Sequence, residues 1–288
     1  MSRIANISGV LAVALLMTPL ATRAGPASVW PPPSNVRIVQ KDGGDNVRTF
    51  TRLDLAVASI TDASASNPYV VKVMPGSFDS FCPNVPAYVS IEGSGASQTT
   101  VCAFNVAHAT VKDVTMIGWS GPWLYAGATL ERVNLQVTGP IGVYVDASDV
   151  QVVDSTIQVQ ATGNGPFYGI FQNRGGFRLV RSKVISPGDA LWLGGEGGAP
   201  SYALDIIDSE IEGGTSAIHL TAPINWITIR GSTLKATSVL VGPDGPYGPG
   251  YFVHAATSKL DGGLSGFVPN TTKIVHCYDG AMNPIPNL

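Results

Sequence analysis

The chain has 288 residues, of which 33 are Gly, 21 are Pro and only 13% are charged. This length suits one large domain, and many Gly and Pro residues with few charges fit tight turns between short strands better than long helices or disorder. The 17 Lys and Arg residues are not clustered along the chain, so the sequence lacks the basic footprint of a nucleic-acid-binding protein and predicts no nucleic-acid partner.

The first 24 residues have the pattern of a secretory signal peptide. Arg3 precedes a short apolar run, and small residues follow up to Ala24. The run is too short for a convincing membrane anchor. We therefore expect a secreted or periplasmic protein whose mature domain is 25–288. Removing Arg3 and Arg23 leaves 15 basic and 20 acidic residues, a formal charge of −5.

Residues 25–68 are expected to form a leader and an N-terminal cap. Residues 35–39 predict a strand, and residues 51–60 place Leu, Val and Ile at roughly helical spacing. Thr49 or Thr51 would serve as the N-cap of this helix. A short amphipathic helix here would cover the first coil of a strand array, whose open end otherwise exposes apolar surface.

Three strands follow at 69–74, 88–92 and 100–104, each alternating and each ending at Gly, Pro or Asn. The chain has three cysteines, Cys82, Cys102 and Cys277. Because Cys82 and Cys102 lie about one coil apart, a disulfide between neighbouring coils is one possibility, with Cys277 left over. Three unpaired thiols are the alternative, and both stay open.

A short motif then recurs seven times, and each copy pairs an apolar or serine residue with an apolar residue two positions later. The pairs are Val114/Met116, Val133/Leu135, Ser155/Ile157, Ser182/Val184, Ser209/Ile211, Ser232/Leu234 and Ser258/Leu260. Successive first members are 19, 22, 27, 27, 23 and 26 residues apart. Similar strands at irregular but bounded intervals are typical of a solenoid.

Each coil divides into three strands. The first is apolar-x-apolar, as at 150–152, the second is the recurring motif, and the third is small-apolar-x-apolar, as at 142–145. Stacking such coils gives three parallel sheets around a narrow core. We expect coils over 69–242 and a last coil with a C-terminal cap over 243–288.

Two segments add a resemblance to this pattern. Residues 71–78 run from a strand into a Pro-Gly-x-Phe turn, and residues 89–95 end a strand in Gly-x-Gly. They look like the opening coils of pectinesterase-like chains, and over 35–288 the sequence resembles the pectin-lyase-like superfamily. The resemblance implies an all-β fold, a single-stranded right-handed parallel β-helix with a short capping helix. It leaves function open, because the superfamily includes lyases, hydrolases, esterases, epimerases, adhesins and non-catalytic modules.

The serines of the motif are expected to point inward, since the residue two positions on is apolar and strand side chains alternate between faces. They would form an internal ladder that needs no catalysis to explain it. Its members are Ser155, Ser182, Ser209, Ser232 and Ser258.

The outward column of the third strand is unusual because it is aromatic. It is expected to contain Tyr125, Tyr144, Phe171, Trp192, His219 and Leu240. Six strands spaced about 4.8 Å apart would make a stripe roughly 24 Å long. A neighbouring column of Gly142, Gly169, Ala190, Ala217 and Ser238 would form the floor of a trough. Three hypotheses follow: a glycan groove that uses Tyr125, Tyr144, Phe171, Trp192 and His219, burial of the stripe under flanking loops, or a contact between subunits of a homo-oligomer.

In the resembling enzymes the catalytic groove lies on this same sheet and is lined by Asp, Arg or Lys. The best acid-base candidates here are Asp146, Arg174 and Asp189. The sequence lacks the Asn-Thr-Asp and Asp-Asp pattern of the related hydrolases and the Gln-Asp and Asp-Phe patterns of pectinesterases. The histidines lack metal-ligand spacing, so we expect neither a metal nor another cofactor.

These features favour an exported β-helix protein that binds a polysaccharide or cell-surface glycan along the aromatic stripe without catalysis. The first alternative is a carbohydrate-active enzyme, a polysaccharide lyase or pectinesterase-like protein that uses Asp146, Arg174 and Asp189. The second alternative is a structural or adhesive solenoid whose stripe contacts another subunit.

Overall fold

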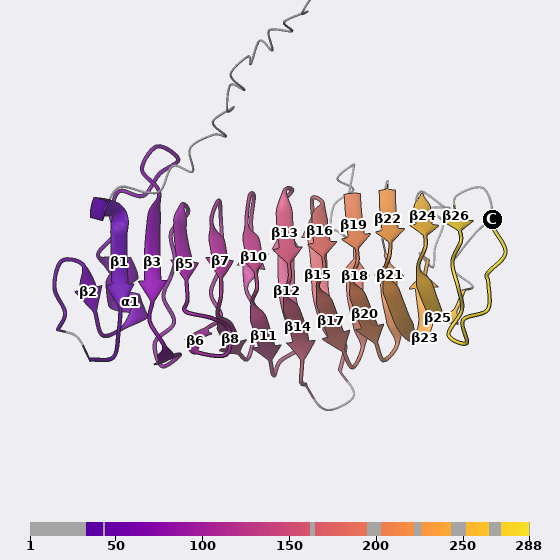
Figure 1. Cartoon of the computed structure of the whole chain (residues 1–288), viewed down its shortest axis with the longest axis horizontal. Coiled ribbons are helices and arrows are strands. Elements are labelled where there is room, and N and C mark those ends of the chain that lie inside the picture. The colour runs from indigo at the N-terminus through magenta and orange to yellow at the C-terminus, as the bar shows by residue number, and fades with distance from the viewer. Residues whose placement is uncertain are drawn as a thin grey trace, which may run out of the picture. The chain divides into compact units, whose positions relative to one another are not determined.

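The computed structural model describes residues 33–42, 44–161, 165–194, 203–221, 226–242, 252–264 and 272–287. The expected signal peptide lies outside these residues. The compact unit Pro31–Leu288 is a parallel β-helix, in which the chain winds through successive coils and places each new strand beside its counterpart in the coil before (Figure 1). All the pairings between named strands are parallel, as the sequence predicts.

The first sheet contains the strands that open each coil. A short 3-10 helix, Pro33–Asn35, precedes it. In spatial order its strands are β2 (Thr49–Phe50), β1 (Val36–Val39), β3 (Tyr69–Val73), β5 (Val89–Glu92), β7 (Thr110–Lys112), β10 (Thr129–Glu131), β13 (Val150–Val153), β16 (Phe177–Val180), β19 (Ala203–Ile207), β22 (Trp226–Arg230), β24 (Val253–Ala256) and β26 (Thr272–Val275).

The second sheet contains the strands of the recurring motif, and the third sheet the strands that close each coil. The second consists of β4 (Gly76–Phe78), β6 (Thr99–Cys102), β8 (Thr115–Gly118), β11 (Asn134–Val137), β14 (Thr156–Val159), β17 (Lys183–Ser186), β20 (Glu210–Gly213) and β25 (Lys259–Gly263). The third consists of β9 (Trp123–Leu124), β12 (Ile141–Asp146), β15 (Tyr168–Arg174), β18 (Asp189–Leu193) and β21 (Ser216–Leu220).

One long strand, β23 (Thr233–Val241), connects the second and third sheets. Its first residues pair with β20 and its last residues pair with β21, so the hydrogen bonds of the two sheets are continuous at this coil. The three faces expected from the sequence are present, and two of them merge towards the C-terminal end.

The capping helix is shorter than expected. Helix α1 is Leu53–Ala58, and its N-cap is Arg52, whose side chain makes no capping hydrogen bond. The expected N-caps have other roles, since Thr49 belongs to β2 and the Thr51 hydroxyl donates to Asp45 at 3.0 Å. The apolar side of the helix packs on the first coil, with Leu53 and Val57 buried.

The core is a column of apolar side chains contributed by all three sheets. Leu130, Leu135 and Val143, which come from the first, second and third strands of one coil, have no exposed surface. The prediction of a Gly and Ala trough is wrong. A Cβ atom on Gly169 would lie 2.4 Å from the Val184 side chain, and Ala190 is fully buried, so this column faces the second sheet rather than solvent. The strict alternation assumed from the sequence fails where the chain bends into the third strand.

The serine ladder lies inside the coil, at the corner between the first and second strands. Each hydroxyl donates to the carbonyl two residues earlier and accepts the backbone N–H of the equivalent residue one coil before, which is Val133 for Ser155 and a serine for the other four. Ser182, for example, donates to the Val180 oxygen at 2.9 Å and accepts from the Ser155 nitrogen at 3.1 Å. The same pair of bonds recurs at Ser155, Ser209, Ser232 and Ser258. Buried Cys277 occupies the next position and contacts the Val275 oxygen in the same way.

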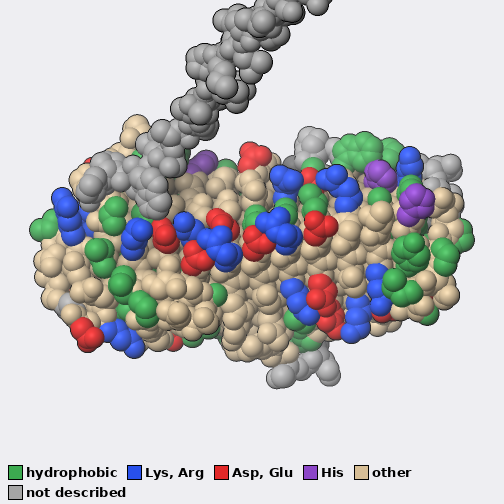
Figure 2. All heavy atoms as spheres, in the orientation of Figure 1, with side chains coloured by type: hydrophobic (Ala, Val, Ile, Leu, Met, Phe, Trp, Pro, Cys, Tyr) green, Lys and Arg blue, Asp and Glu red, His purple; other side chains and the backbone are tan. Residues whose placement is uncertain are grey.

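The residue before each ladder position turns the corner with a positive φ, and these residues alternate in charge. The column is Asp113, Arg132, Asp154, Arg181 and Asp208, with φ between 46° and 58°, followed by Gly231. Arg132 binds Asp113 through two bonds of 2.7 and 2.9 Å, and Arg181 binds Asp154 at 2.7 and 2.8 Å. Figure 2 shows basic and acidic side chains side by side along this face.

We expect Ser182→Ala to lower the free energy of unfolding by about 1–3 kcal/mol, because it leaves the buried Ser155 N–H and Val180 carbonyl without this partner. Urea unfolding followed by circular dichroism measures the change. Ser80→Ala, at an exposed serine, is the control and should stay within about 0.5 kcal/mol of wild type. Unfolding of Ser182→Ala at the wild-type urea concentration would show that the ladder does not stabilise the fold.

Candidate ligand-binding surface

The outward column of the third sheet is aromatic, as predicted, but its register differs at both ends. Tyr144 pairs with Phe171, and Phe171 with Trp192, as expected. Tyr144 also pairs with Trp123 instead of Tyr125, which lies two residues further on. At the other end Trp192 pairs with His219, and His219 pairs with Val241 instead of Leu240, which is fully buried.

Four rings of this column form a continuous stack, which we call the aromatic stack: Trp123, Tyr144, Phe171 and Trp192. Successive ring centroids are 4.0, 5.1 and 4.2 Å apart, with interplanar angles of 23°, 12° and 10°. The spacing follows from the separation of adjacent strands, about 4.8 Å, which places outward side chains of neighbouring coils in contact. The inner rings therefore use their faces on one another and turn their edges to solvent.

The stack is partly covered and partly open. Tyr168, from the start of β15, packs against the rings of Phe171 and Trp192 at 5.4 and 5.7 Å. At the other end Trp123 belongs to β9, the terminal strand of its sheet, and is 39% exposed. Trp119, in the connection that leads from β8 to β9, is 71% exposed. Solvent-accessible indole surface is therefore concentrated at the N-terminal end of the stack.

Asp189 lies at the start of β18 in a polar cluster with His219 and Ser216. His219 Nδ1 lies 2.8 Å from one carboxylate oxygen of Asp189, and the Ser216 hydroxyl donates to the other at 2.6 Å. Burial, the largest single influence, raises the pKa of Asp189, but the hydrogen bonds from His219 and Ser216 and the charge of His219 outweigh it. The net effect is a pKa below the usual 3.8.

Asp146 and Arg174 lie at the other end of the third-sheet strands. The Asn173 amide donates to Asp146 at 2.9 Å, and Arg174 Nε lies 3.7 Å from the same oxygen. Asp189 pairs in register with Tyr168, and Tyr168 with Ile141, five residues before Asp146. Five residues of strand span about 16 Å, so the structure does not bring the three acid-base candidates into one site.

Cys82 and Cys102 form a disulfide, with Cα atoms 5.5 Å apart, and Cys277 is a buried free thiol. The disulfide fits an oxidising compartment. In the described part of the chain, no group of His, Cys, Asp or Glu has the arrangement of a metal site. No helix among the described residues is long and apolar enough to span a membrane.

Two features of this surface were missed by sequence reasoning, although signals for both exist. Trp123 is 21 residues before Tyr144, the same interval that separates Phe171 from Trp192, whereas Tyr125 is only 19 residues before it. The contact of Ser216 with Asp189 joins residues 27 positions apart, an interval that also separates Ser155 from Ser182. Coil lengths vary along the chain, so such an interval is a signal for an equivalent position but does not fix it: His219 pairs with Val241, 22 residues later, rather than with Leu240.

Several solved structures resemble the fold of this chain. Pectate lyase Pel9A superposes with a TM-score of 0.55 at 11% identity, over 85% of this chain and 74% of the lyase. Pectin methylesterase PemA from Erwinia chrysanthemi gives 0.51 at 12% identity, over 87% of this chain and 91% of the esterase. ORF18 of Geobacillus virus E2 gives 0.54 at 10% identity over 79% of this chain, which spans only 58% of that viral protein.

This chain has the right-handed parallel β-helix fold of the pectin-lyase-like type. The expectation drawn from the sequence is confirmed. No protein-family model matches the chain, and no curated protein matches it. At 10–12% identity the likeness establishes the fold alone, because one fold hosts many unrelated activities.

We expect Asp189→Asn to destabilise the protein by about 1–3 kcal/mol at pH 7, because Asn cannot replace the carboxylate that His219 and Ser216 contact. The folded-state pKa of Asp189 lies below its unfolded value of 3.8, so the ionised group stabilises the fold above about pH 4. This stabilisation is lost as the pH falls through the folded-state pKa.

Urea unfolding of the wild type and of Asp189→Asn between pH 7 and pH 2 tests this. The stability difference should be largest above about pH 4 and should shrink below it. Asp42→Asn, at an exposed carboxyl, is the control and should follow the wild-type curve. A constant difference at every pH would show that the ionisation of Asp189 does not matter.

Proposed function

We propose that this protein binds a carbohydrate polymer along its third sheet, through the aromatic stack and the exposed indoles at its N-terminal end. The observation that carries the proposal is that the four rings from Trp123 to Trp192 stack one on the next without a gap. They occupy the outward column of the third sheet, where an enzyme with an acid-base groove would have charged side chains. The fold likeness to a pectate lyase and a pectin methylesterase supports a polysaccharide of the pectin type as the first ligand to test.

The geometry suits a polymer for two reasons. The rings are held by one another and by neighbouring strands, so a ligand would lose little affinity to ordering them. Trp123 and Trp119 offer indole surface at the open end of the column, where a sugar ring can stack. Towards the other end of the stack, the edges of the rings offer a flat apolar surface to the methylene and methyl groups of the polysaccharide.

The charges beside the stack favour an uncharged form of the polymer. Asp146 lies beside Arg174, and Asp189 is hydrogen-bonded by His219, so the acidic groups at both ends have basic neighbours. A strongly anionic chain would find no excess of positive charge among these residues. Highly methyl-esterified pectin is therefore the better candidate, and unesterified polygalacturonate the weaker one.

We expect Trp123→Ala to weaken binding to methyl-esterified pectin by about tenfold, the loss of roughly 1.4 kcal/mol of stacking. Affinity electrophoresis in gels with and without the polymer measures retardation. Tyr278→Ala is a matched control, since Tyr278 has the same 39% exposure but lies outside the third sheet. Absence of retardation of the wild type, or equal retardation of wild type and Trp123→Ala, would refute the proposal.

Catalysis is a second candidate function, favoured by the contact between Asp189 and His219. A carboxylate that orients an imidazole is a common arrangement for a general base. Incubation with pectin and polygalacturonate, followed by assays for reducing ends, unsaturated products and released methanol, tests it. An activity that is lost in His219→Ala would support the enzyme, whereas wild-type inactivity in all three assays would leave binding alone.

A structural or adhesive role is the third candidate, in which a second copy of the chain covers the stack. Light scattering over a range of concentrations distinguishes it. A dimer that dissociates in Trp123→Ala would support this role, and a monomer at all concentrations would contradict it.

A further inference from the structure

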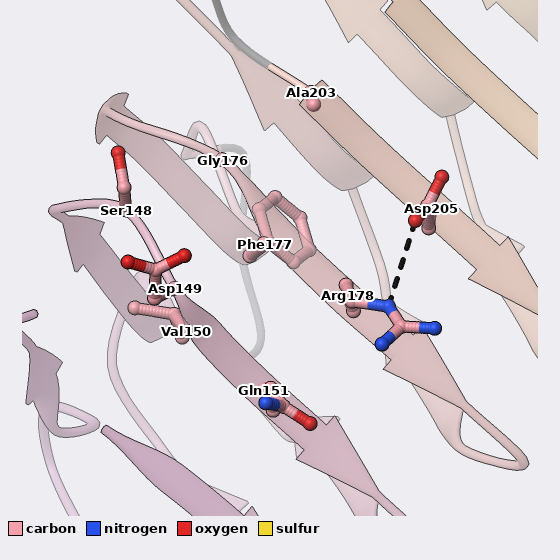
Figure 3. Close-up of a pocket in the computed structure, with 9 residues that line it drawn as sticks. All are labelled: Ser148, Asp149, Val150, Gln151, Gly176, Phe177, Arg178, Ala203 and Asp205. Carbon is pink, nitrogen blue, oxygen red and sulfur yellow. Dashed lines mark ion pairs between the residues drawn. The ribbon is translucent and has the colours of Figure 1, made fainter. Parts of the chain in front are cut away.

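The first sheet carries a hollow on its outer face, away from the third-sheet surface. Its volume is about 370 Å³, within the range of small-molecule sites. It is formed where β13, β16 and β19 begin, as Figure 3 shows. The lining residues are Ser148, Asp149, Val150, Gln151, Gly176, Phe177, Arg178, Ala203 and Asp205.

The hollow exists because two small residues interrupt an outward column of larger ones. Register places Asp149, Gly176, Ala203, Trp226 and Phe252 on successive coils. A Cβ atom on Gly176 would lie only 2.6 Å from the Ala203 carbonyl oxygen, so no larger side chain fits there. The surface is therefore depressed at Gly176 and Ala203, where two adjacent strands begin. The Asp149 carboxylate lies at the start of the strand before them and the Trp226 indole at the start of the strand after them.

Two exposed aromatic rings lie on the strands next to the hollow, since Trp226 pairs in register with Ala203 of its lining. Trp226 is 58% exposed and Phe252 is 49% exposed, and their ring centroids are 5.3 Å apart. Apolar side chains gather on the surface over the starts of β22 and β24 (Figure 2). From the strand of Asp149 to that of Trp226 is three strand spacings, about 14 Å, the scale of a short oligosaccharide.

The polar side of the hollow has unused hydrogen-bonding groups. Gln151, Arg178 and Asp205 lie in one row across adjacent strands. Arg178 reaches Asp205 through Nε at 3.5 Å, which leaves its two terminal nitrogens to donate elsewhere. Among the described residues, no side-chain hydrogen bond engages the Gln151 amide or the Asp149 carboxylate. The hollow therefore offers both donors and acceptors beside an aromatic ring.

The charge of these groups selects the ligand. One cation, Arg178, and two anions, Asp149 and Asp205, sum to −1, which disfavours sugars that carry a carboxylate or a sulfate. Neutral sugars combine hydroxyls that both donate and accept with an apolar ring face, which the amide, guanidinium, carboxylates and indole complement. We propose that this hollow is a second saccharide site, which binds a short neutral oligosaccharide against Trp226.

This proposal does not depend on the polymer site of the third sheet, because the two surfaces share no residue. The experiment uses the full chain and a panel of neutral oligosaccharides built from glucose, xylose, galactose or arabinose, with trigalacturonate as the acidic comparison. Saturation-transfer NMR detects binding, and calorimetry measures the dissociation constant of the ligand that binds. We expect at least one neutral ligand to bind and trigalacturonate to bind more weakly.

Trp226→Ala and Arg178→Ala should each weaken that binding by about tenfold, and Gln151→Ala by a smaller factor. All three positions are exposed enough that the thermal midpoint should hardly change, which separates loss of binding from loss of folding. Trp123→Ala is the matched control, since it removes an exposed indole from the other surface and should leave the affinity unchanged.

The outcomes separate the two sites. Neutral-sugar binding that is lost in Trp226→Ala and kept in Trp123→Ala supports the second site, whatever the result with pectin. Failure of every neutral ligand to bind, wild-type affinity in both Trp226→Ala and Arg178→Ala, or loss of the binding in Trp123→Ala would overturn it.

Discussion

The corner between the first and second strands of each coil is the constraint on which the rest of this fold depends. A residue with positive φ turns the chain there, and for residues other than Gly this conformation costs about 1–2 kcal/mol. The serine hydroxyl that follows satisfies a carbonyl of its own coil and an N–H of the coil before, which offsets the cost. Because the five corners from Ser155 to Ser258 repeat this geometry, the three sheets stay in phase there, and outward columns on the other faces line up from coil to coil.

The two proposed ligand surfaces are consequences of this alignment. On the third sheet, in-phase strands place aromatic rings at contact distance, and the result is a rigid stack. On the first sheet, the same alignment places Gly176 beside Ala203, and the result is a hollow. The size of the side chains at equivalent positions on successive coils thus decides whether the surface of a parallel β-helix has a ridge or a depression there. The backbone is the same in both cases.

Much of the architecture could be predicted from the sequence, because it depends on short, repeated patterns. The inward serines and the three-strand coil follow from local alternation, and the structure has both. Positions that depend on loop length were harder. The sequence pattern puts Tyr125 in the aromatic column instead of Trp123, because the loops between strands vary in length and a shift of two residues preserves the alternation. The acid-base candidates Asp146, Arg174 and Asp189 are expected together because the coil pattern puts them on or beside adjacent strands of the third sheet, but the register puts Asp146 and Asp189 at opposite ends of their strands.

The alternating charges at the corners have a consequence for how such a chain can change in length. From Asp113 through Arg132, Asp154 and Arg181 to Asp208, the sign of the corner residue alternates from coil to coil, and ion pairs join Arg132 to Asp113 and Arg181 to Asp154. Loss of the single coil that contains Arg181 would bring Asp154 beside Asp208, and like charges directly opposite one another are destabilising. Loss or duplication of two coils at once keeps the alternation. Within this stretch, electrostatics therefore favours growth and shrinkage by pairs of coils, so that the unit of duplication is twice the unit of structure.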